Sequence, residues 1–310
     1  MKKLQWMISL IFIISLVACA VDIGIIQIIE HPALDAARRG FMDELEARGV
    51  KANYSYHNAQ GDIATLYTIA GNIVASKVDL ILAIATPSAQ AAANATSEIP
   101  ILITAVTDPQ NAGLVKDFDK PGTNVTGTSD MNPVEKQLEL VKRLVPKASS
   151  VGIIYNAGEA NSVVQIEIAK KAAEKLGLKL VLVTVSETSG VFQAAQSLQG
   201  RVDAVYVPTD NTVVAALESV IAFCERNKIP LIAGETESVA RGALATIGLD
   251  YYELGRQTGA MAVEVLNGAN PAETPIQFQE TAILMVNKSA AQRMGITIPQ
   301  DLLEEAEVVE

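Results

Sequence analysis

The sequence predicts an α/β protein with two similar lobes, each built on a parallel sheet, and a hinge between them. Residues 202–235 read as strand, polar turn, helix and strand, and residues 78–106 repeat that order with the same Val-Asp opening and the same Ile-Pro before the second strand. A second pair of stretches, 21–56 and 151–185, also matches, since each reads strand, polar loop, helix, Gly-containing turn and strand. Such alternation is typical of Rossmann-like lobes, in which ligands bind beyond the carboxyl ends of the strands.

The first half of the chain carries the signals of one lobe. Pro32 suits the first position of a helix, Asp62 suits a helix cap, and Thr86-Pro87 marks a third helix start, with Thr86 as a plausible cap. The segment 107–123 is rich in Gly, Pro, Asp and Asn, and we expect a loop there. We expect strands at 21–29, 51–57, 80–85, 101–106 and 125–127, and helices at 32–47, 62–76 and 86–95.

The second half repeats these signals. Asn132-Pro133-Val134-Glu135 combines a cap, a Pro and a third-position Glu, which predicts a helix start. Asp250 is expected to cap a long helix over 251–266, and the acidic tail 304–310 is expected to fray. We expect further strands at 151–155, 179–185, 204–207, 231–233, 243–247 and 278–286, and helices over 213–224 and 289–294.

Composition bounds the class of protein. The chain has 310 residues, enough for one large or two ordinary domains, and its mean hydropathy of +0.26 leaves ample apolar material for cores. The net charge of −11 argues against a nucleic-acid partner, because such partners need basic patches.

The N-terminus reads as a targeting segment. Lys2 and Lys3 precede an apolar run, Leu4 to Val17, which ends in a Leu-Val-Ala-Cys sequence resembling a bacterial lipobox. We therefore expect residues 1–19 to include a lipoprotein signal peptide and Cys19 to carry the lipid that anchors the chain outside the cytoplasm. The alternatives are an ordinary exported chain or an uncleaved anchor. The first strand begins at about Val21, so the lobe lies close to the membrane or the usual tether is missing.

The chain gives no sign of metal, cofactor or catalytic chemistry. Its two histidines, His31 and His57, argue against a His-rich metal site, and Cys224 fits a buried core position. There is no nucleophile elbow, phosphate-binding loop or Cys-x-x-Cys motif, so we predict no enzyme activity, no cofactor and no metal.

Short polar side chains gather instead at the predicted strand ends and helix starts. Several have structural interpretations: Ser162 with Gln165 fits a capping box, and Asp210 or Asn211 could cap the next helix. Together they suit a ligand, and His31 either reaches the same cleft or packs beside Pro32. The candidate ligand-binding residues are His31, Thr86, Ser88, Thr107, Asp108, Tyr155, Asn156, Glu159, Asn161, Ser162, Asp210, Asn211 and Glu235.

These residue types predict a zwitterionic ligand such as an amino acid. Helix N-termini offer free N–H groups that suit a carboxylate, and we expect Thr86 and Ser88 of one lobe and Asn161 and Ser162 of the other to hold it as a hinge closes. Asp210, Glu235 or Asp108 could neutralise an ammonium group, and we expect Asp210 to contact it directly.

The chain resembles the ABC-transporter substrate-binding lipoproteins whose characterised members bind aromatic amino acids such as tryptophan, tyrosine or phenylalanine. The resemblance covers the whole mature chain. It rests on His31-Pro32-Ala33-Leu34-Asp35, Ala85-Thr86-Pro87-Ser88-Ala89, Val106-Thr107-Asp108-Pro109, Asn124-Val125-Thr126-Gly127, Tyr155-Asn156, Glu159-Ala160-Asn161-Ser162 and Pro208-Thr209-Asp210-Asn211.

The resemblance implies a type I periplasmic-binding-protein-like fold and delivery of cargo to an ABC permease with its ATPase subunits. By analogy with two-lobed binding proteins, we expect an N-terminal lobe of 21–127 plus about 250–280 and a C-terminal lobe of 128–249 plus about 281–310, working as a monomer. Aromatic residues are only 5% of the chain, so Tyr155 is our first candidate for stacking on an aromatic cargo. The alternatives are a binding protein for a sugar or nucleoside, or a non-transport sensor on the same fold.

Overall fold

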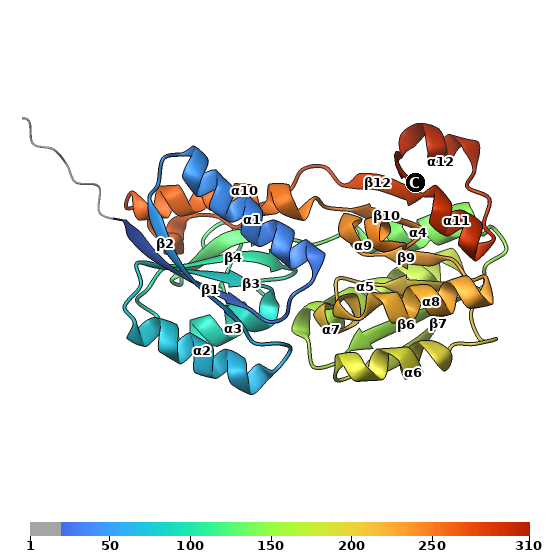
Figure 1. The fold of residues 1–310 in the computed structure, drawn as a ribbon, viewed down its shortest axis with the longest axis horizontal. Coiled ribbons are helices and arrows are strands. Elements are labelled where there is room, and N and C mark those ends of the chain that lie inside the picture. Colours follow the sequence, from blue (N-terminus) through green and yellow to red (C-terminus); the bar gives the residue numbers. More distant parts are fainter. Residues whose placement is uncertain (1–19) are drawn as a thin grey trace, which may run out of the picture.

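The computed structural model describes residues 20–310 as two α/β lobes that lie side by side along the long axis of the molecule (Figure 1). The N-terminal lobe contains a sheet of six strands in the order β11-β5-β4-β3-β1-β2, with every pairing parallel. Helices α1 and α10 cover one face of this sheet, and α2 and α3 cover the other (Figure 1). Its strands and helices are β1 (Val21–Gln27), α1 (Pro32–Ala47), β2 (Ala52–Asn58), α2 (Ile63–Ala75), β3 (Leu80–Ile84), α3 (Thr86–Ala95), β4 (Ile101–Val106), β5 (Val125–Ser129), α10 (Tyr251–Leu266) and β11 (Gln277–Phe278).

The C-terminal lobe contains a sheet of seven strands in the order β13-β12-β10-β9-β8-β6-β7. Only the pairing of β12 with β10 is antiparallel, and Cys224 is buried in the core of this lobe, as predicted. Its elements are α4 (Val134–Leu144), β6 (Ser150–Asn156), α5 (Ala160–Leu176), β7 (Lys179–Val185), α6 (Val191–Gln196), β8 (Ala204–Val207), α7 (Asn211–Ala215), α8 (Leu217–Asn227), β9 (Leu231–Ala233), α9 (Thr236–Arg241), β10 (Ala245–Gly248), β12 (Ile283–Asn287), α11 (Lys288–Met294), α12 (Gln300–Glu305) and β13 (Glu307–Val309).

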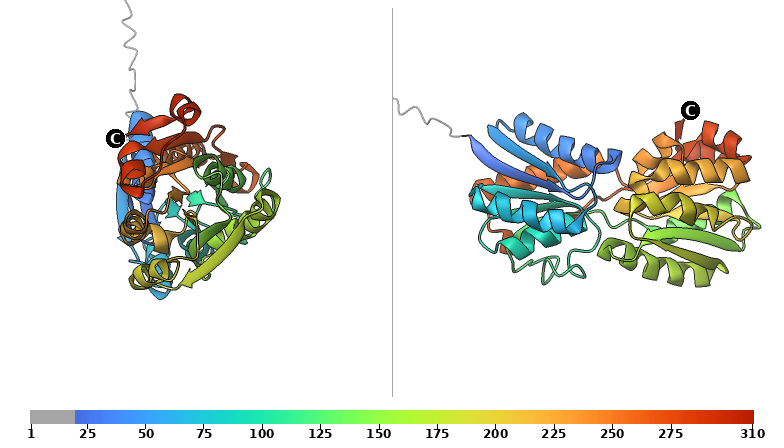
Figure 2. Two further views of the ribbon diagram at one scale, coloured as in Figure 1. Left: turned by 90° about the vertical axis from the view of Figure 1, so that its right-hand side faces the viewer. Right: turned by 60° about the horizontal axis from the view of Figure 1, so that its bottom comes forward.

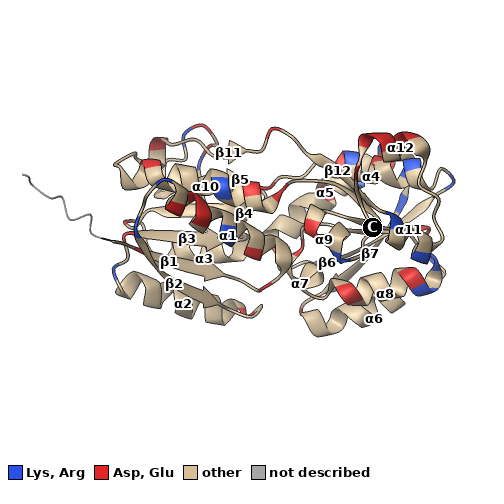
Figure 3. Ribbon diagram, turned by 45° about the horizontal axis from the view of Figure 1, so that its top comes forward, with Lys and Arg blue, Asp and Glu red and all other residues tan. Residues whose placement is uncertain are grey.

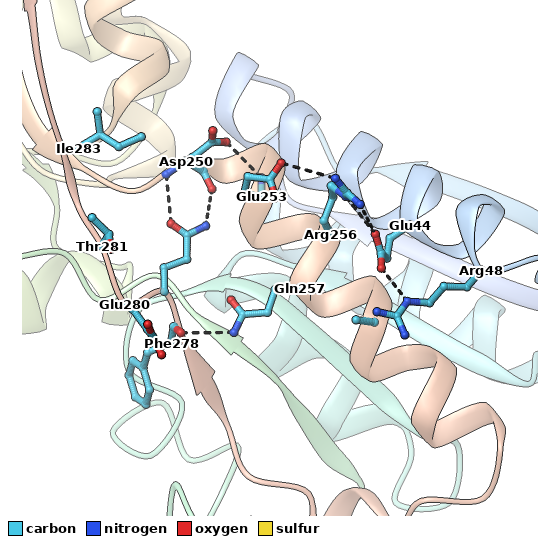
Figure 4. A pocket seen from close by; sticks show the side chains of 12 residues that line it. Glu44, Arg48, Asp250, Glu253, Arg256, Gln257, Phe278, Glu280, Thr281 and Ile283 are labelled. Carbon is cyan, nitrogen blue, oxygen red and sulfur yellow. Dashed lines mark hydrogen bonds and ion pairs between the residues drawn. The ribbon is translucent and has the colours of Figure 1, made fainter. Parts of the chain in front are cut away.

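The chain passes between the lobes at three places: from β5 to α4, from β10 to α10 and from β11 to β12 (Figure 2). The second and third of these crossing segments are tied together by one side chain. The amide of Gln279 donates to the carbonyl oxygen of Asp250 at 2.6 Å and accepts from the Asp250 N–H at 3.2 Å. Figure 4 shows Asp250 beside an outward-facing pocket at the start of α10, and Gln279 lines the same pocket. The second and third crossing segments are therefore joined by the two hydrogen bonds of a single side chain.

Two predictions near the C-terminus are wrong. The strand expected over 278–286 is two short strands, because β11 joins the sheet of one lobe and β12 joins the sheet of the other. Local alternation of side chains cannot reveal that a segment changes sheets. The tail expected to fray is ordered, since α12 precedes β13 and β13 pairs with β12.

Helix starts were predicted with mixed success. Asp62 and Asp250 cap α2 and α10 through their carboxylates, as predicted. The Asn132 cap is wrong: α4 begins after Pro133, and the Asn132 amide donates to the carbonyl oxygen of Asp130 at 2.9 Å. The single helix expected over 213–224 is divided into α7 and α8 at Ala216.

Helix α10 completes the N-terminal lobe by packing very closely on α1. A Cβ atom on Gly255 would lie 1.9 Å from the carbonyl oxygen of Ala37, and one on Gly40 would lie 2.0 Å from that of Tyr252. Glu44 of α1 strengthens the contact, because its carboxylate binds Arg256 of α10 at 2.8 Å (Figure 4). Glycine is thus required where the two backbones touch.

We expect Gly255→Ala to lower the free energy of unfolding by about 2 kcal/mol or more, because the added methyl group meets backbone that cannot move aside. The measurement is the urea midpoint of residues 20–310. Gly71→Ala is the matched control: Gly71 is an exposed residue inside α2, a Cβ atom added there would have no neighbour within 4 Å, and alanine favours a helix by about 1 kcal/mol. A Gly255→Ala midpoint equal to that of the unchanged protein would contradict this account of the packing.

Candidate functional site

The carboxyl ends of the parallel strands of both lobes point toward each other and enclose a cavity. About 270 Å³ of space there is free of protein atoms, but the centre of a water-sized sphere can occupy only about 10 Å³ of it, which is room for about one water molecule. The lobes are therefore nearly in contact around it. The lining residues are His31, Leu34, Ala105, Asp130, Asn161, Thr209, Asn211, Val214, Glu235 and Tyr251.

A larger groove leads from this cavity to solvent between the lobes. Asn211 lines both spaces, and the groove has a volume of about 560 Å³. Ile29, Ile63 and Pro87 form part of its N-terminal wall, and Thr188 lies on the opposite wall. The cavity and groove together form the interlobe cleft.

In residues 20–310, most buried polar atoms without hydrogen-bond partners lie where strands end, helices start or the chain crosses between the lobes, and those of His31 and Asn161 line the cavity. Of the seven such side-chain atoms in residues 20–310, six belong to strand ends, helix starts or the first crossing segment, and the seventh is on α6. The six are both ring nitrogens of His31, the hydroxyls of Thr86 and Ser88, and the Oδ1 atoms of Asn132 and Asn161. Because buried polar groups in proteins are normally paired, this cluster indicates a place that binds a ligand.

His31 stands at the start of α1 and is only 7% exposed. Burial lowers the pKa of its imidazole to about 3, and Arg241 lowers it further while the neighbouring Asn211 side chain opposes the shift. The ring is therefore neutral at physiological pH. Of the two alternatives that the sequence left open for His31, the structure favours the one in which the side chain reaches the cleft.

The backbone is strained where two strands of the N-terminal lobe reach the cleft. Ala85, which follows β3, has a φ of 75°, and Ala105 in β4 has a φ of 56°; both are left-handed values that non-glycine residues rarely adopt. Ala85 is also the residue that precedes α3, so the expectation that Thr86 caps this helix is wrong. Thr86 is the first helical residue instead, and its hydroxyl finds no partner in the part of the chain that the structure describes. Strain of this kind is common at ligand sites.

In the C-terminal lobe, Asp210 belongs to the internal framework. One carboxylate oxygen accepts from the Val213 N–H at 2.8 Å, and the other accepts from the Asn156 N–H and the Ser162 hydroxyl, both at 2.6 Å. Burial and the nearby Glu159 raise the pKa of Asp210 to about 7. The predicted cap of α7 by Asp210 is confirmed, but this geometry does not support direct contact between Asp210 and a ligand.

Glu159 ties the same framework to the next turn. Its carboxylate accepts from the Asn211 side chain at 2.5 Å, from the Thr212 hydroxyl at 2.8 Å and from the Asn161 amide at 3.2 Å. The capping box expected from Ser162 is wrong, because α5 begins after Glu159 and the Ser162 hydroxyl donates to Asp210. Glu159 and Ser162 therefore position Asn161 and Asn211, which do reach the cavity.

Comparison with known proteins places the chain in a family. The sequence profile described as "ABC transporter substrate binding protein" matches residues 22–310. The chain is 46% identical to a tyrosine-binding protein of Clostridioides difficile over 89% of its own length and 81% of that protein. The chain belongs to the ABC transporter substrate-binding proteins.

Two solved structures show which arrangement of the lobes this substrate-binding protein adopts. The L-Trp complex of an ABC domain from Streptococcus pneumoniae is 39% identical and superposes with a TM-score of 0.91, covering 94% of this chain and 100% of that chain. The ligand-free, open structure of a substrate-binding protein with adhesive properties from Clostridium difficile is 45% identical, covers 94% and 99%, and superposes with a TM-score of only 0.70. The lower score despite the higher identity indicates that the lobes are closed here.

Family membership settles the broad predictions. The two-lobed type I fold is confirmed, and solute-binding proteins only 16–18% identical share it with TM-scores of 0.63–0.65. As a substrate-binding protein of an ABC transporter, the chain acts outside the cytoplasm, binds a small molecule and is not an enzyme. Within residues 20–310, no helix is both long enough and apolar enough to cross a membrane.

Four of the thirteen candidate residues of this substrate-binding protein line the cavity, namely His31, Asn161, Asn211 and Glu235, and the other nine do not. Tyr155 is half-buried in β6 and packs on the core of the C-terminal lobe. Asp108 sits in the loop after β4, where its carboxylate accepts from the Asn111 N–H at 2.9 Å. Thr107 is next to the cavity rather than on it, because its hydroxyl donates to Asp130 at 2.9 Å.

Sequence reasoning missed Asp130 and Tyr251. Both line the cavity, and the Tyr251 hydroxyl donates a hydrogen bond to the Asp130 carboxylate. Asp130 lies in the first crossing segment, and Tyr251 begins α10 directly after the second. No local pattern singled out either residue, because they are 121 residues apart in the sequence and meet only in the folded chain.

Proposed function

We propose that this chain is the amino-acid-binding lipoprotein of an ABC importer, and that it holds an aromatic amino acid between its lobes. One observation carries the proposal: within residues 20–310, buried polar atoms without partners line an enclosed cavity from both lobes, on His31 of the N-terminal lobe and Asn161 of the C-terminal lobe. A ligand with both donors and acceptors would satisfy them. A hydrocarbon ligand would leave them unpaired at a cost of about 1–3 kcal/mol each.

The carboxylate of an amino acid has a suitable place at the start of α3. The Thr86 and Ser88 hydroxyls lie in the first turn of this helix, which spans Thr86–Ala95, and neither has a hydrogen-bond partner within residues 20–310. Free N–H groups and the positive end of the helix dipole favour an anion at that position. Helix α3 contacts α5 of the other lobe, so a carboxylate there would lie between the lobes.

The relatives and the residues of the cavity wall both support the proposal that the cargo has an aromatic side chain. One relative is a tyrosine-binding protein, and one similar structure holds L-Trp. Tyr251 and His31 bring rings to the cavity, and Leu34 and Val214 add apolar surface. Tyr251, not Tyr155, is the side chain positioned to pack on an aromatic cargo.

Binding requires the lobes to open and close. The cavity has room for only about one water molecule in this arrangement, so the lobes must separate to admit an amino acid and must lie further apart than they do here while they hold it. The three crossing segments absorb the rotation while each lobe keeps its own core. A closed form that depends on cargo gives the permease a means of recognising the loaded protein.

We expect L-tyrosine, L-tryptophan or L-phenylalanine to raise the melting temperature of residues 20–310, with a dissociation constant measurable by calorimetry. Saturation should also shrink the radius of gyration in small-angle scattering, at a mass that corresponds to a monomer. Glucose and uridine serve as controls for the sugar and nucleoside alternatives. If only a control ligand binds, the amino-acid proposal is wrong, and an unchanged radius on saturation would count against closure.

The affinity for the ligand should change with pH as the imidazole of His31 gains or loses its proton. The pKa of His31 is about 3 in the closed form, against an ordinary value near 6.5, so the open form takes up a proton first as the pH falls. Closure is therefore favoured fully above pH 6.5 and is penalised by about 1.4 kcal/mol per unit below it. We expect affinity for the bound amino acid to fall about tenfold between pH 7.5 and 5.5.

The variant His31→Asn should lose most of this pH dependence, because asparagine does not titrate. His57→Asn is the matched control, since His57 is an exposed residue of β2 and the chain's other histidine. The test is to measure the affinity of each variant and of the unchanged protein by calorimetry at three pH values. The same profile in His31→Asn and in the unchanged protein would show that His31 does not control closure.

The lipid anchor remains a proposal supported by the sequence, because Cys19 lies outside the described residues. The short apolar run before Leu16-Val17-Ala18-Cys19 supports cleavage there and attachment of the chain to the outer face of the cell membrane. The described chain starts at Ala20 and enters β1 at Val21. The strand end far from the cleft would then face the membrane anchor directly.

We expect Cys19→Ser to abolish incorporation of a fatty-acid probe in cells and to release the protein from the membrane fraction. Cys224→Ser is the control, because Cys224 is a buried core residue that should not affect labelling. Continued labelling of the Cys19→Ser protein would disprove the anchor.

A further inference from the structure

One end of the cavity is strongly acidic. Asp130 is 3% exposed and lies in the first crossing segment, and Glu235 is 1% exposed and precedes α9. Tyr251, which begins α10, is 2% exposed and lines the same cavity. Figure 3 shows acidic segments beside the labels of β5 and α9, near the junction of the lobes. Three separate parts of the chain thus bring oxygen atoms to one place.

Neither carboxylate has a cationic partner in the described chain, residues 20–310. Asp130 accepts from the Thr107 hydroxyl at 2.9 Å and from the Tyr251 hydroxyl. Glu235 accepts from the Ser238 N–H at 2.9 Å and from the Ser238 hydroxyl. No Lys, Arg or His lies within 4.0 Å of either carboxylate in residues 20–310. A carboxylate can accept about four hydrogen bonds, so both retain acceptor capacity.

The remaining charged groups around this end do not neutralise it. Glu237 of α9 lies beside Glu235, and burial together with that neighbour raises the pKa of Glu237 to about 9. Burial also raises the pKa of Asp130. Arg241 is engaged elsewhere, since it pairs with Glu218 at 2.8 Å and donates to the Val214 carbonyl oxygen at 2.7 Å. His31 is neutral, so the acidic end lacks a compensating positive charge.

Unpartnered polar atoms on the other walls show that a ligand belongs here. Asn161 is 4% exposed, lines the cavity and leaves its Oδ1 atom, an acceptor, without a donor in the described part of the chain. Both nitrogens of His31 also have no hydrogen-bond partner among residues 20–310. Asp130, Glu235 and Asn161 thus bring acceptor atoms from three side chains to one small enclosed space, and an ammonium group has three N–H donors to match them. A carboxylate would instead be repelled.

We infer that Asp130 and Glu235, with Tyr251 and Asn161, bind the ammonium group of the ligand and restrict this protein to cargo that carries a free amino group. The inference deepens the proposed function and rests on it. It gives the site two chemical poles: the first turn of α3 for the carboxylate, and the crossing segments for the amine. The amine pole involves both lobes, because Tyr251 packs in the N-terminal core and Glu235 belongs to the C-terminal lobe. Loading by an amine therefore stabilises the closed arrangement.

The test compares L-tyrosine with 3-(4-hydroxyphenyl)propionate, which lacks only the amino group, and with tyramine, which lacks only the carboxylate. In the unchanged protein, we expect the propionate to bind at least about 30-fold more weakly than tyrosine, because a buried charge pair is lost. Asp130→Asn and Glu235→Gln should each weaken tyrosine binding by about 30-fold or more while leaving affinity for the propionate unchanged or improved. Asp79→Asn is the matched control, since Asp79 is exposed at the opposite end of the strands.

The change in the ratio of the two affinities separates recognition from folding. A variant that weakens tyrosine and the propionate equally has lost structure, and that result in both Asp130→Asn and Glu235→Gln overturns the inference. Equal binding of tyrosine and the propionate to the unchanged protein overturns it too. Failure of all three aromatic amino acids contradicts the proposed function instead. In that case, a melting-temperature shift with tyramine that Asp130→Asn abolishes would still support the amine pole, and the absence of any shift would overturn it.

Discussion

The need to pair polar groups in a dry space is the constraint on which the rest of this structure depends. Parallel sheets place polar turns at the carboxyl ends of their strands, and closure of the lobes removes those turns from water. Asp210 and Glu159 show one solution, since each carboxylate is satisfied by backbone and side-chain donors of its own lobe. His31, Thr86 and Ser88 show the opposite case, because closure leaves them without partners within residues 20–310. The closed form is therefore stable only to the extent that something else supplies the missing hydrogen bonds.

The crossing segments combine mechanics with chemistry. They connect lobes that have separate cores, and the Gln279 amide holds two of them together. They also carry Asp130 and Tyr251 into the cavity. A group bound at these residues would therefore act where the chain connects the two lobes. A ligand that contacts the crossing segments would couple the filling of the binding site to the angle between the two lobes.

Much of the fold could be predicted from sequence, because strand and helix periodicity is local and the two halves repeat it. The paired stretches 21–56 and 151–185 and the caps Asp62 and Asp250 are confirmed in this way. The failures arise where the answer depends on distant segments. The division of 278–286 between two sheets is invisible to local alternation, and the direction of the Asp210 side chain depends on Asn156 and Ser162, which come some fifty residues earlier. Position at a strand end predicted the neighbourhood of the site but could not tell framework residues from those that face the cavity.

The close contact of α1 with α10 has a consequence for how the chain acquires its structure. The core of the N-terminal lobe includes Leu254, Met261 and Ile276, which are separated from α1 by most of the C-terminal lobe. The first lobe cannot finish folding when its first 129 residues have been synthesised, because one face of its sheet waits for a helix that comes more than a hundred residues later. Such long-range contacts slow folding. The two lobes are thus separate bodies in space but not successive folding units along the chain, and a truncation before α10 would leave the N-terminal lobe with an exposed apolar face.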